Sequence, residues 1–130
     1  MQGRLRAIRG ATTVAANERE LIIEAARELT EAVIAENGLE LDDIVSVIFT
    51  ATPDLSAEFP AVGARAFGLV NTPLICAQEI PVPGSQPRCI RMLMHAYMAV
   101  DRPVRPVYLR EAVSLRPDLQ LQSTGRRDQA

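Results

Sequence analysis

Apolar residues recur at helical spacing between residues 17 and 38. The recurring positions are Leu21, Ile22, Ala25, Leu29, Ala32 and Val33. They repeat every three or four residues, as on one face of a helix. Asn17 precedes Glu20 by three residues, as in a capping pair, and Asn37-Gly38 is a typical helix end. The pattern predicts a long helix with one buried face.

Apolar runs of strand length lie on either side of this helix. Residues 4–10 alternate arginine with apolar residues before a polar turn at 11–13, and residues 44–49 are a β-branched run. After a loop at 50–55, a shorter helix is predicted over 57–68, with Pro60 in its first turn. Residues 73–78 form the third predicted strand, and the proline-rich residues from 81 to 84 form a loop.

The C-terminal third predicts one more helix and two short strands. Pro87 stands where a first helical residue would. The apolar positions behind it are Ile90, Leu93, Met94, Tyr97 and Met98. They predict a third helix over 89–100, followed by strands at 104–109 and 112–115. The order βαβαβαβ indicates an α/β fold, a single domain over 1–121 whose helices cover one side of a mixed sheet. The polar residues 122–130 read as a flexible tail.

Composition narrows the classes of function. A chain of 130 residues with 48% apolar residues is one globular domain. It has no apolar run near the ~20 residues of a membrane span and no signal-peptide layout, so a cytoplasmic protein is expected. The net charge of −2 and the pI near 5.4 indicate neither a nucleic acid nor a membrane partner.

All fourteen cationic residues are arginine. A lysine Schiff base and a P-loop lysine are therefore excluded. The two cysteines, Cys76 and Cys89, lack metal-ligand spacing, and with His95 as the single histidine no metal site is expected. Cys76 and His95 are most simply read as structural residues.

Several charged residues have contexts that need explaining. Arg9 lies inside an apolar strand, and Arg91 lies near the start of the third predicted helix. Arg65 lies on the shorter predicted helix, and Arg116 follows the last predicted strand. Each of these arginines alone is more simply read as a solvated or ion-paired residue. By the same reasoning, Glu79 at a strand end is more simply read as a surface carboxylate, and Tyr108 as a packing residue. If several of these arginines converge, they would form a site for a dianionic small molecule.

Five segments resemble, in order and spacing, the AroH-type monofunctional chorismate mutases. The first is residues 6–14, which read Arg-Ala-Ile-Arg-Gly-Ala-Thr-Thr-Val. The others are residues 51–55 with 59–61, residues 76–79, residues 89–91 with Met94, and residues 107–109 running to 115–119. The resemblance covers most of the chain, about residues 4 to 121. The sequence differs from the family at Val62, where members often carry lysine.

The resemblance implies a homotrimer with a barrel-like pseudo-α/β core and active sites between neighbouring chains. From one chain the implied site residues are Arg9, Cys76, Glu79, Arg91 and Tyr108. The neighbouring chain would add Phe59, Ala61 and Arg65. Leu74 and Ile75 would lie beside Cys76, and Leu115 and Arg116 near the pocket mouth.

The implied reaction is the rearrangement of chorismate to prephenate, a step of the shikimate pathway and of aromatic amino acid biosynthesis. It is unimolecular, so no cofactor or metal is expected. Arg91 would stabilise charge on the breaking ether oxygen, Arg9 would bind a carboxylate with help from Tyr108, and Glu79 would accept a hydrogen bond from the ring hydroxyl.

Two other classes of function remain open from the sequence. One is a non-catalytic trimeric module of the same fold that binds an aromatic or dicarboxylate metabolite. The other is a purely structural trimer, which predicts no ligand.

Overall fold

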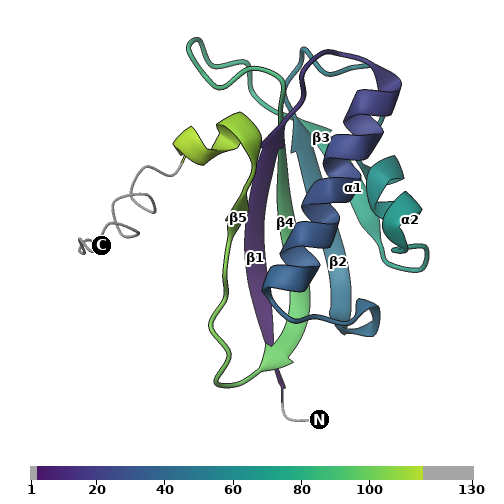
Figure 1. Ribbon diagram of the computed structural model, residues 1–130, viewed down its shortest axis with the longest axis vertical. Helices are drawn as coiled ribbons and strands as arrows, with labels where there is room; N and C mark the ends of the chain where they lie inside the picture. Colours follow the sequence, from purple (N-terminus) through teal and green to yellow (C-terminus); the bar gives the residue numbers. More distant parts are fainter. Residues whose placement is uncertain (1–2, 116–130) are drawn as a thin grey trace.

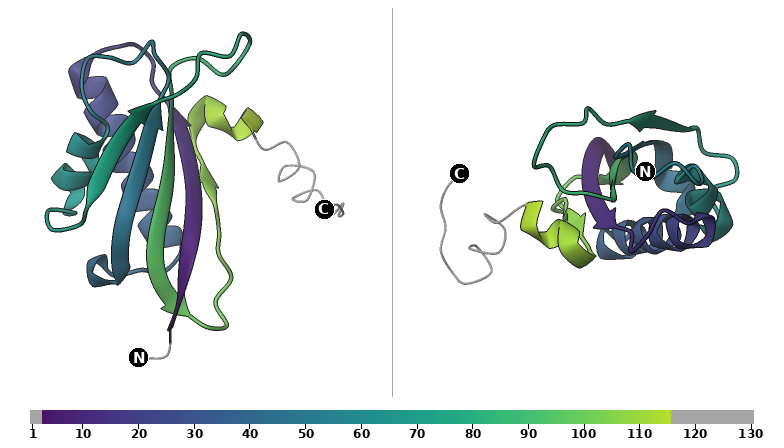
Figure 2. Two further views of the ribbon diagram at one scale, coloured as in Figure 1. Left: turned by 180° about the vertical axis from the view of Figure 1, so that it is seen from behind. Right: turned by 90° about the horizontal axis from the view of Figure 1, so that it is seen from above.

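A mixed five-stranded sheet carries both helices on one face, as the computed structural model shows over residues 3–115, the part of the chain that it describes (Figures 1 and 2). The elements in chain order are β1 (Gly3–Thr13), α1 (Arg19–Glu36), β2 (Ile44–Ala51), α2 (Ala61–Phe67), β3 (Leu74–Gln78), β4 (Cys89–Ala99) and β5 (Val107–Tyr108). Short 3-10 turns occupy Leu41–Asp43 and Arg110–Leu115. The predicted α/β class with a mixed sheet is confirmed.

The sheet has the order β3-β2-β4-β1-β5. Strand β4 lies in the middle and runs antiparallel to both β1 and β2. The two outer pairs, β2 with β3 and β1 with β5, are parallel. The first and last strands of residues 3–115 are therefore neighbours at one edge.

The core lies between the sheet and α1. The helix buries its predicted apolar face, with Ile22, Leu29 and Val33 fully buried, against strand residues such as Phe49 and Met94. Helix α2 packs on α1 through Gly63, where an added Cβ would lie 2.4 Å from the Ile23 carbonyl oxygen. Only glycine permits this approach of the two helix backbones.

The opposite face of the sheet is uncovered in the single chain. Residues on alternate positions of β4, from Ile90 to Met98, are buried beneath the helices, and the intervening ones face away from them. Large apolar side chains on this open face are exposed, namely Leu5, Ile48, Ile75 and Tyr97. Several exposed large apolar side chains on one face of a sheet are typical of an interaction site.

The third predicted helix is wrong, because residues 89–99 form the central strand β4. Ile90, Met94 and Met98 are four residues apart, a spacing that puts them on one side of a helix and also on one side of a strand. The intervening Leu93 and Tyr97 are apolar too, so the alternation expected of a half-buried strand is hidden. Pairing with β1 and β2 then overrides the helix propensity of Met, Leu and Ala.

The C-terminal strands are also corrected. Only Val107–Tyr108 of the predicted strand 104–109 pairs with the sheet, and residues 112–115 belong to the 3-10 turn. Strand β1 continues through the predicted turn at 11–13, and α2 begins at Ala61 rather than at residue 57. The predicted tail at 122–130 lies outside the described residues.

The long predicted helix is confirmed, but its predicted cap is not. The N-cap residue is Glu18, without a side-chain cap bond. The Asn17 carboxamide oxygen instead accepts hydrogen bonds from the backbone N–H groups of Ser56 and Ala57, both 2.9 Å. Among residues 3–115, neither helix combines the length and the apolar character of a membrane-spanning segment.

Candidate active site

Two candidate residues, Arg91 and Tyr108, lie in one transverse row of the sheet, to which four strands contribute one residue each. Arg91 of β4 is the register partner of Thr50 on β2 and of Ala11 on β1. Ala11 in turn pairs with Tyr108 of β5. Residues in one transverse row point to the same face of a sheet, and this is the face that the helices leave uncovered. Arg9 lies on the same face, two residues before Ala11.

Arg91 is held by an ion pair with Glu79. Its Nε lies 2.9 Å from Glu79 Oε2, and the same oxygen accepts a hydrogen bond of 2.5 Å from the Thr50 hydroxyl. The Glu79 backbone N–H donates to the Ala51 carbonyl at 2.9 Å, which fixes the residue just beyond β3. The Glu79 side chain is 15% exposed and the Arg91 side chain 44%. The carboxylate is thus a largely buried support, and the guanidinium reaches solvent.

A surface depression of about 120 Å³ lies beside this ion pair. We name it the arginine depression; its lining residues are Arg9, Gly10, Ala11, Arg91, Met92, Tyr108 and Leu115. Arg9 is exposed, and among residues 3–115 it makes no ion pair. The depression therefore presents two guanidinium groups and a tyrosine to a ligand, a combination suited to carboxylates.

A second hollow, of about 290 Å³, lies at the other edge of the sheet. It is lined by Phe59, Pro60, Cys76 and neighbouring residues of the 51–60 loop and β3, and we name it the Phe59 pocket. The Ala61 backbone and the charge of Arg65 both act to lower the pKa of Cys76, so these two residues lie near this lining residue of the pocket. Burial raises the pKa of Cys76, which keeps the thiol neutral at ordinary pH.

The structure therefore divides the predicted site residues into two groups. Leu74 and Cys76 face α2, whereas Ile75 between them faces the open side with Arg91. Cys76 was predicted to line a pocket together with Arg9 from the same chain, and one chain does not bring them together. Strand β3 is three strand spacings from β1, about 14 Å. Arg116 lies outside the described residues.

Thr50 is a site residue that sequence reasoning missed. It was predicted as the first residue of the loop at 50–55, one residue before the segment 51–55 that carries the resemblance, and the structure instead places it in β2. Its role follows from the strand register, which brings Thr50 beside Arg91, and from its bond to Glu79. No sequence signal encodes either contact.

No group of three or more His, Cys, Asp or Glu residues within the described part of the chain is placed to hold a metal ion. The chemistry that the described site can supply is positive charge from Arg9 and Arg91, hydrogen bonding from Tyr108 and Glu79, and apolar contact from Leu115. This set can bind and orient an anion.

Comparisons with known proteins agree with this chemistry. The sequence family described as chorismate mutase type I matches residues 5–119. The chorismate mutase AroH of Thermus thermophilus is 49% identical over 120 residues, which is 89% of this chain and 97% of the relative. The chorismate mutase AroH of Bacillus subtilis is 42% identical, over 90% of this chain and 94% of the relative.

A solved structure gives the same result for the fold. A chorismate mutase from Clostridium thermocellum superimposes with a TM-score of 0.79 at 46% identity, covering 84% of this chain and 98% of that one. The chain therefore belongs to the chorismate mutase type I family and is an enzyme of the isomerase class. The predicted family and activity are confirmed.

Proposed function

We propose that this chorismate mutase rearranges chorismate to prephenate in the arginine depression, by charge stabilisation and positioning, without a cofactor. We place it in the cytoplasm, in aromatic amino acid biosynthesis. The observation that carries the proposal is the Arg91 guanidinium, which Glu79 holds at the edge of a depression that Arg9 and Tyr108 also line. Substrate carboxylates and a breaking C–O bond need this set of groups and no nucleophile or base.

Arg91 is the group that we assign to the transition state. As the C–O bond breaks, negative charge grows on the ether oxygen, and a fixed cation stabilises it most when the cation needs no reorganisation. Glu79 Oε2 lies 2.9 Å from Nε of Arg91. We assign the two terminal amino groups of the guanidinium to the substrate. Arginine keeps its charge and its planar geometry throughout.

The remaining groups bind and orient the substrate. Arg9 pairs with one carboxylate, and the Tyr108 hydroxyl supports it. Glu79 uses Oε2 for Thr50 and Arg91, so Oε1 accepts the hydrogen bond from the ring hydroxyl. Contacts on both the ring and the side chain hold the enolpyruvyl group over the ring, where a unimolecular rearrangement gains most from positioning.

A neighbouring chain completes the cleft in our proposal, within a homotrimer. Small-molecule pockets usually measure about 300–1,000 Å³, and the arginine depression holds about 120 Å³. The Phe59 pocket, with Arg65 and Cys76, would supply the missing wall from the next chain. The uncovered apolar sheet face, with Ile48 and Tyr97 exposed, supports assembly through this face.

The activity test compares the wild type with Arg91→Ala and Arg91→Lys. We measure loss of chorismate and formation of prephenate. Loss of one preorganised donor costs about 3–4 kcal/mol, so Arg91→Ala should lower kcat by about 10²–10³ or more, and Arg91→Lys should recover part of it. Arg27→Ala is the control, because Arg27 also pairs with carboxylates, Glu24 and Glu31, but on α1. Normal turnover by Arg91→Ala would refute the electrostatic assignment.

The shared cleft is tested by mixing inactive subunits. Arg91→Ala is refolded together with a variant that carries Phe59→Ala and Arg65→Ala. In a cyclic trimer each hybrid regains one intact cleft, so an equal mixture should recover about a quarter of wild-type activity. Mixing Arg91→Ala with Arg9→Ala is the control, because both residues belong to the same wall and no cleft is restored. No recovery in the first mixture would contradict the shared cleft.

A further inference from the structure

One short segment carries two residues of the arginine depression. Tyr108 ends β5 and Leu115 ends the 3-10 turn that follows it, and both line the depression. Few backbone bonds hold this segment to the sheet. Beyond the two paired residues of β5, the Leu109 N–H donates to the Ala11 carbonyl at 2.9 Å. Side chains must therefore fix the segment if Tyr108 and Leu115 are to be preorganised.

Arg110 stands at the point where the segment turns. Its φ of 55° lies in the left-handed region, which is unfavourable for a residue with a side chain. A residue persists there when the surrounding contacts determine its conformation. The chain leaves β5 at this position and enters the 3-10 turn of Arg110–Leu115. The backbone conformation of Arg110 thus determines where the 3-10 turn places Leu115.

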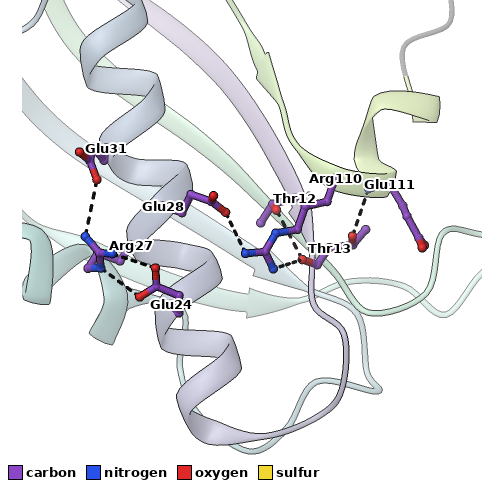
Figure 3. Close-up of polar contacts among 8 residues, drawn as sticks. All are labelled: Thr12, Thr13, Glu24, Arg27, Glu28, Glu31, Arg110 and Glu111. Atoms are coloured by element: carbon purple, nitrogen blue, oxygen red, sulfur yellow. Dashed lines mark hydrogen bonds and ion pairs between the residues drawn. The ribbon is translucent and has the colours of Figure 1, made fainter.

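The Arg110 side chain joins three elements (Figure 3). Its Nη1 donates to the Thr13 carbonyl at the end of β1, 3.2 Å away, and its Nη2 donates to Glu28 Oε1 of α1 at 2.9 Å. The next backbone N–H, of Glu111, donates to the Thr13 hydroxyl at 3.3 Å. We name these four residues the Arg110 cluster. The cluster connects the segment to both β1 and α1.

We propose that Arg110 is a positioning residue for the reaction. Through Thr13 and Glu28 it holds Tyr108 and Leu115 against the arginine depression, although Arg110 itself is not one of the residues that line it. The inference rests on the proposed function of that depression. Tyr108 and Leu115 contact the substrate alike before and during the reaction, so their misplacement weakens binding rather than the chemical step.

The expected result is therefore a rise in KM with little change in kcat. Arg110→Gln should raise KM about tenfold, the size expected when one charge-assisted contact that orders a binding element is lost. Arg110→Lys keeps the charge but not the two-point geometry, so it should fall between the wild type and Arg110→Gln. Glu28→Gln removes one of the two partners and should raise KM by a smaller factor.

Arg27→Gln is the matched control. The Arg27 side chain is 38% exposed and that of Arg110 is 39%. Arg27 also pairs with glutamates of α1, 2.8 Å from Glu24 and 3.5 Å from Glu31, and Figure 3 shows them on the same helix as Glu28, the partner of Arg110. Of these two arginines, Arg110 is the one that belongs to the segment ending at Leu115. The kcat and KM of Arg27→Gln should equal those of the wild type.

Arg110→Gly separates positioning from folding. Glycine adopts the left-handed conformation without penalty, so this variant should fold as well as the wild type while lacking the guanidinium. It should show the same rise in KM as Arg110→Gln. Wild-type KM in both variants would overturn the proposal, and so would a loss confined to kcat. Wild-type enzyme that does not turn over chorismate would instead contradict the proposed function.

Hydrogen exchange tests the positioning without any substrate. The amides of Leu109 and Ala112 donate to the carbonyls of Ala11 and Leu109, at 2.9 and 3.0 Å. In Arg110→Gln they should exchange at least several-fold faster than in the wild type, and in Arg27→Gln at the wild-type rate. Unchanged exchange at both amides in Arg110→Gln would also overturn the proposal, whatever the activity of the enzyme.

Discussion

The Thr50 hydroxyl is the contact whose removal most directly tests how Glu79 and Arg91 are held. It donates to Glu79 Oε2 at 2.5 Å, and the Arg91 Nε lies 2.9 Å from the same oxygen. Thr50→Val keeps the shape of the side chain and removes this donor from a carboxylate that is 15% exposed. A hydrogen bond to a charged group contributes about 1.5–3 kcal/mol. Full transmission to the transition state would lower kcat/KM about 10-fold to 150-fold.

We expect about a tenfold loss of kcat/KM, because the ion pair with Arg91 still restrains Glu79 after the substitution. Most of this loss should be a decrease in kcat, because a displaced Arg91 loses contact with charge that exists only in the transition state. Initial rates of chorismate loss over a range of concentrations give both constants. The control is Thr30→Val, which removes a buried hydroxyl of α1 bonded to the Ala26 carbonyl. Wild-type kcat/KM in Thr50→Val would refute the claim that Glu79 needs this support.

Two stability predictions concern residues outside the site. Gly63→Ala should destabilise the fold by about 1–3 kcal/mol or more, because the new Cβ would lie 2.4 Å from the Ile23 carbonyl oxygen. The loss should appear as a lower midpoint of urea unfolding. An unchanged midpoint would show that α1 and α2 can separate without cost. Burial raises the pKa of the Cys89 thiol to about 11 from its ordinary 9.0. The unfolded chain therefore loses this proton first as pH rises, and the free energy of unfolding should fall by about 2–3 kcal/mol between about pH 9 and 11. Urea titrations of Cys89→Ala should lack this part of the decline, and equal slopes in both proteins would contradict the assignment.

The sequence pattern correctly predicted the elements whose signal lies within a single segment of the chain. Helix α1 was found because its apolar face, from Ile22 to Val33, repeats within one segment. Strand β2 was found because Ile44–Phe49 is a β-branched run. Strand β4 was missed because its identity as a strand depends on partners that lie about 80 residues before it and 45 before it in the chain. Such pairings override local propensity and leave no local signal.

The candidate site shows the same limit at the level of side chains. The resemblance named Arg9, Cys76 and Arg91 as site residues, but it did not state on which face of the sheet each lies. That depends on register, since a shift of one residue reverses every side chain of a strand. The register turns Cys76 toward α2 and Arg91 toward the open face. The contacts of Thr50 and Arg110 likewise required the folded chain.

The position of the ion pair within the sheet suits a reaction that needs no acid, base or cofactor. An enzyme for a unimolecular rearrangement can act only by holding charges and contacts in fixed places, and donors gain most when they do not move during the reaction. Arg91 lies on the central strand, with bonded strands on both sides, and Glu79 follows β3 directly. Tyr108 and Leu115, in contrast, belong to a short edge segment that depends on the Arg110 cluster. The rigid centre of the sheet therefore carries the group assigned to the chemical step, and its less restrained edge carries groups assigned to binding. This division is the reason that substitutions at Arg91 should change kcat, and substitutions at Arg110 should change KM.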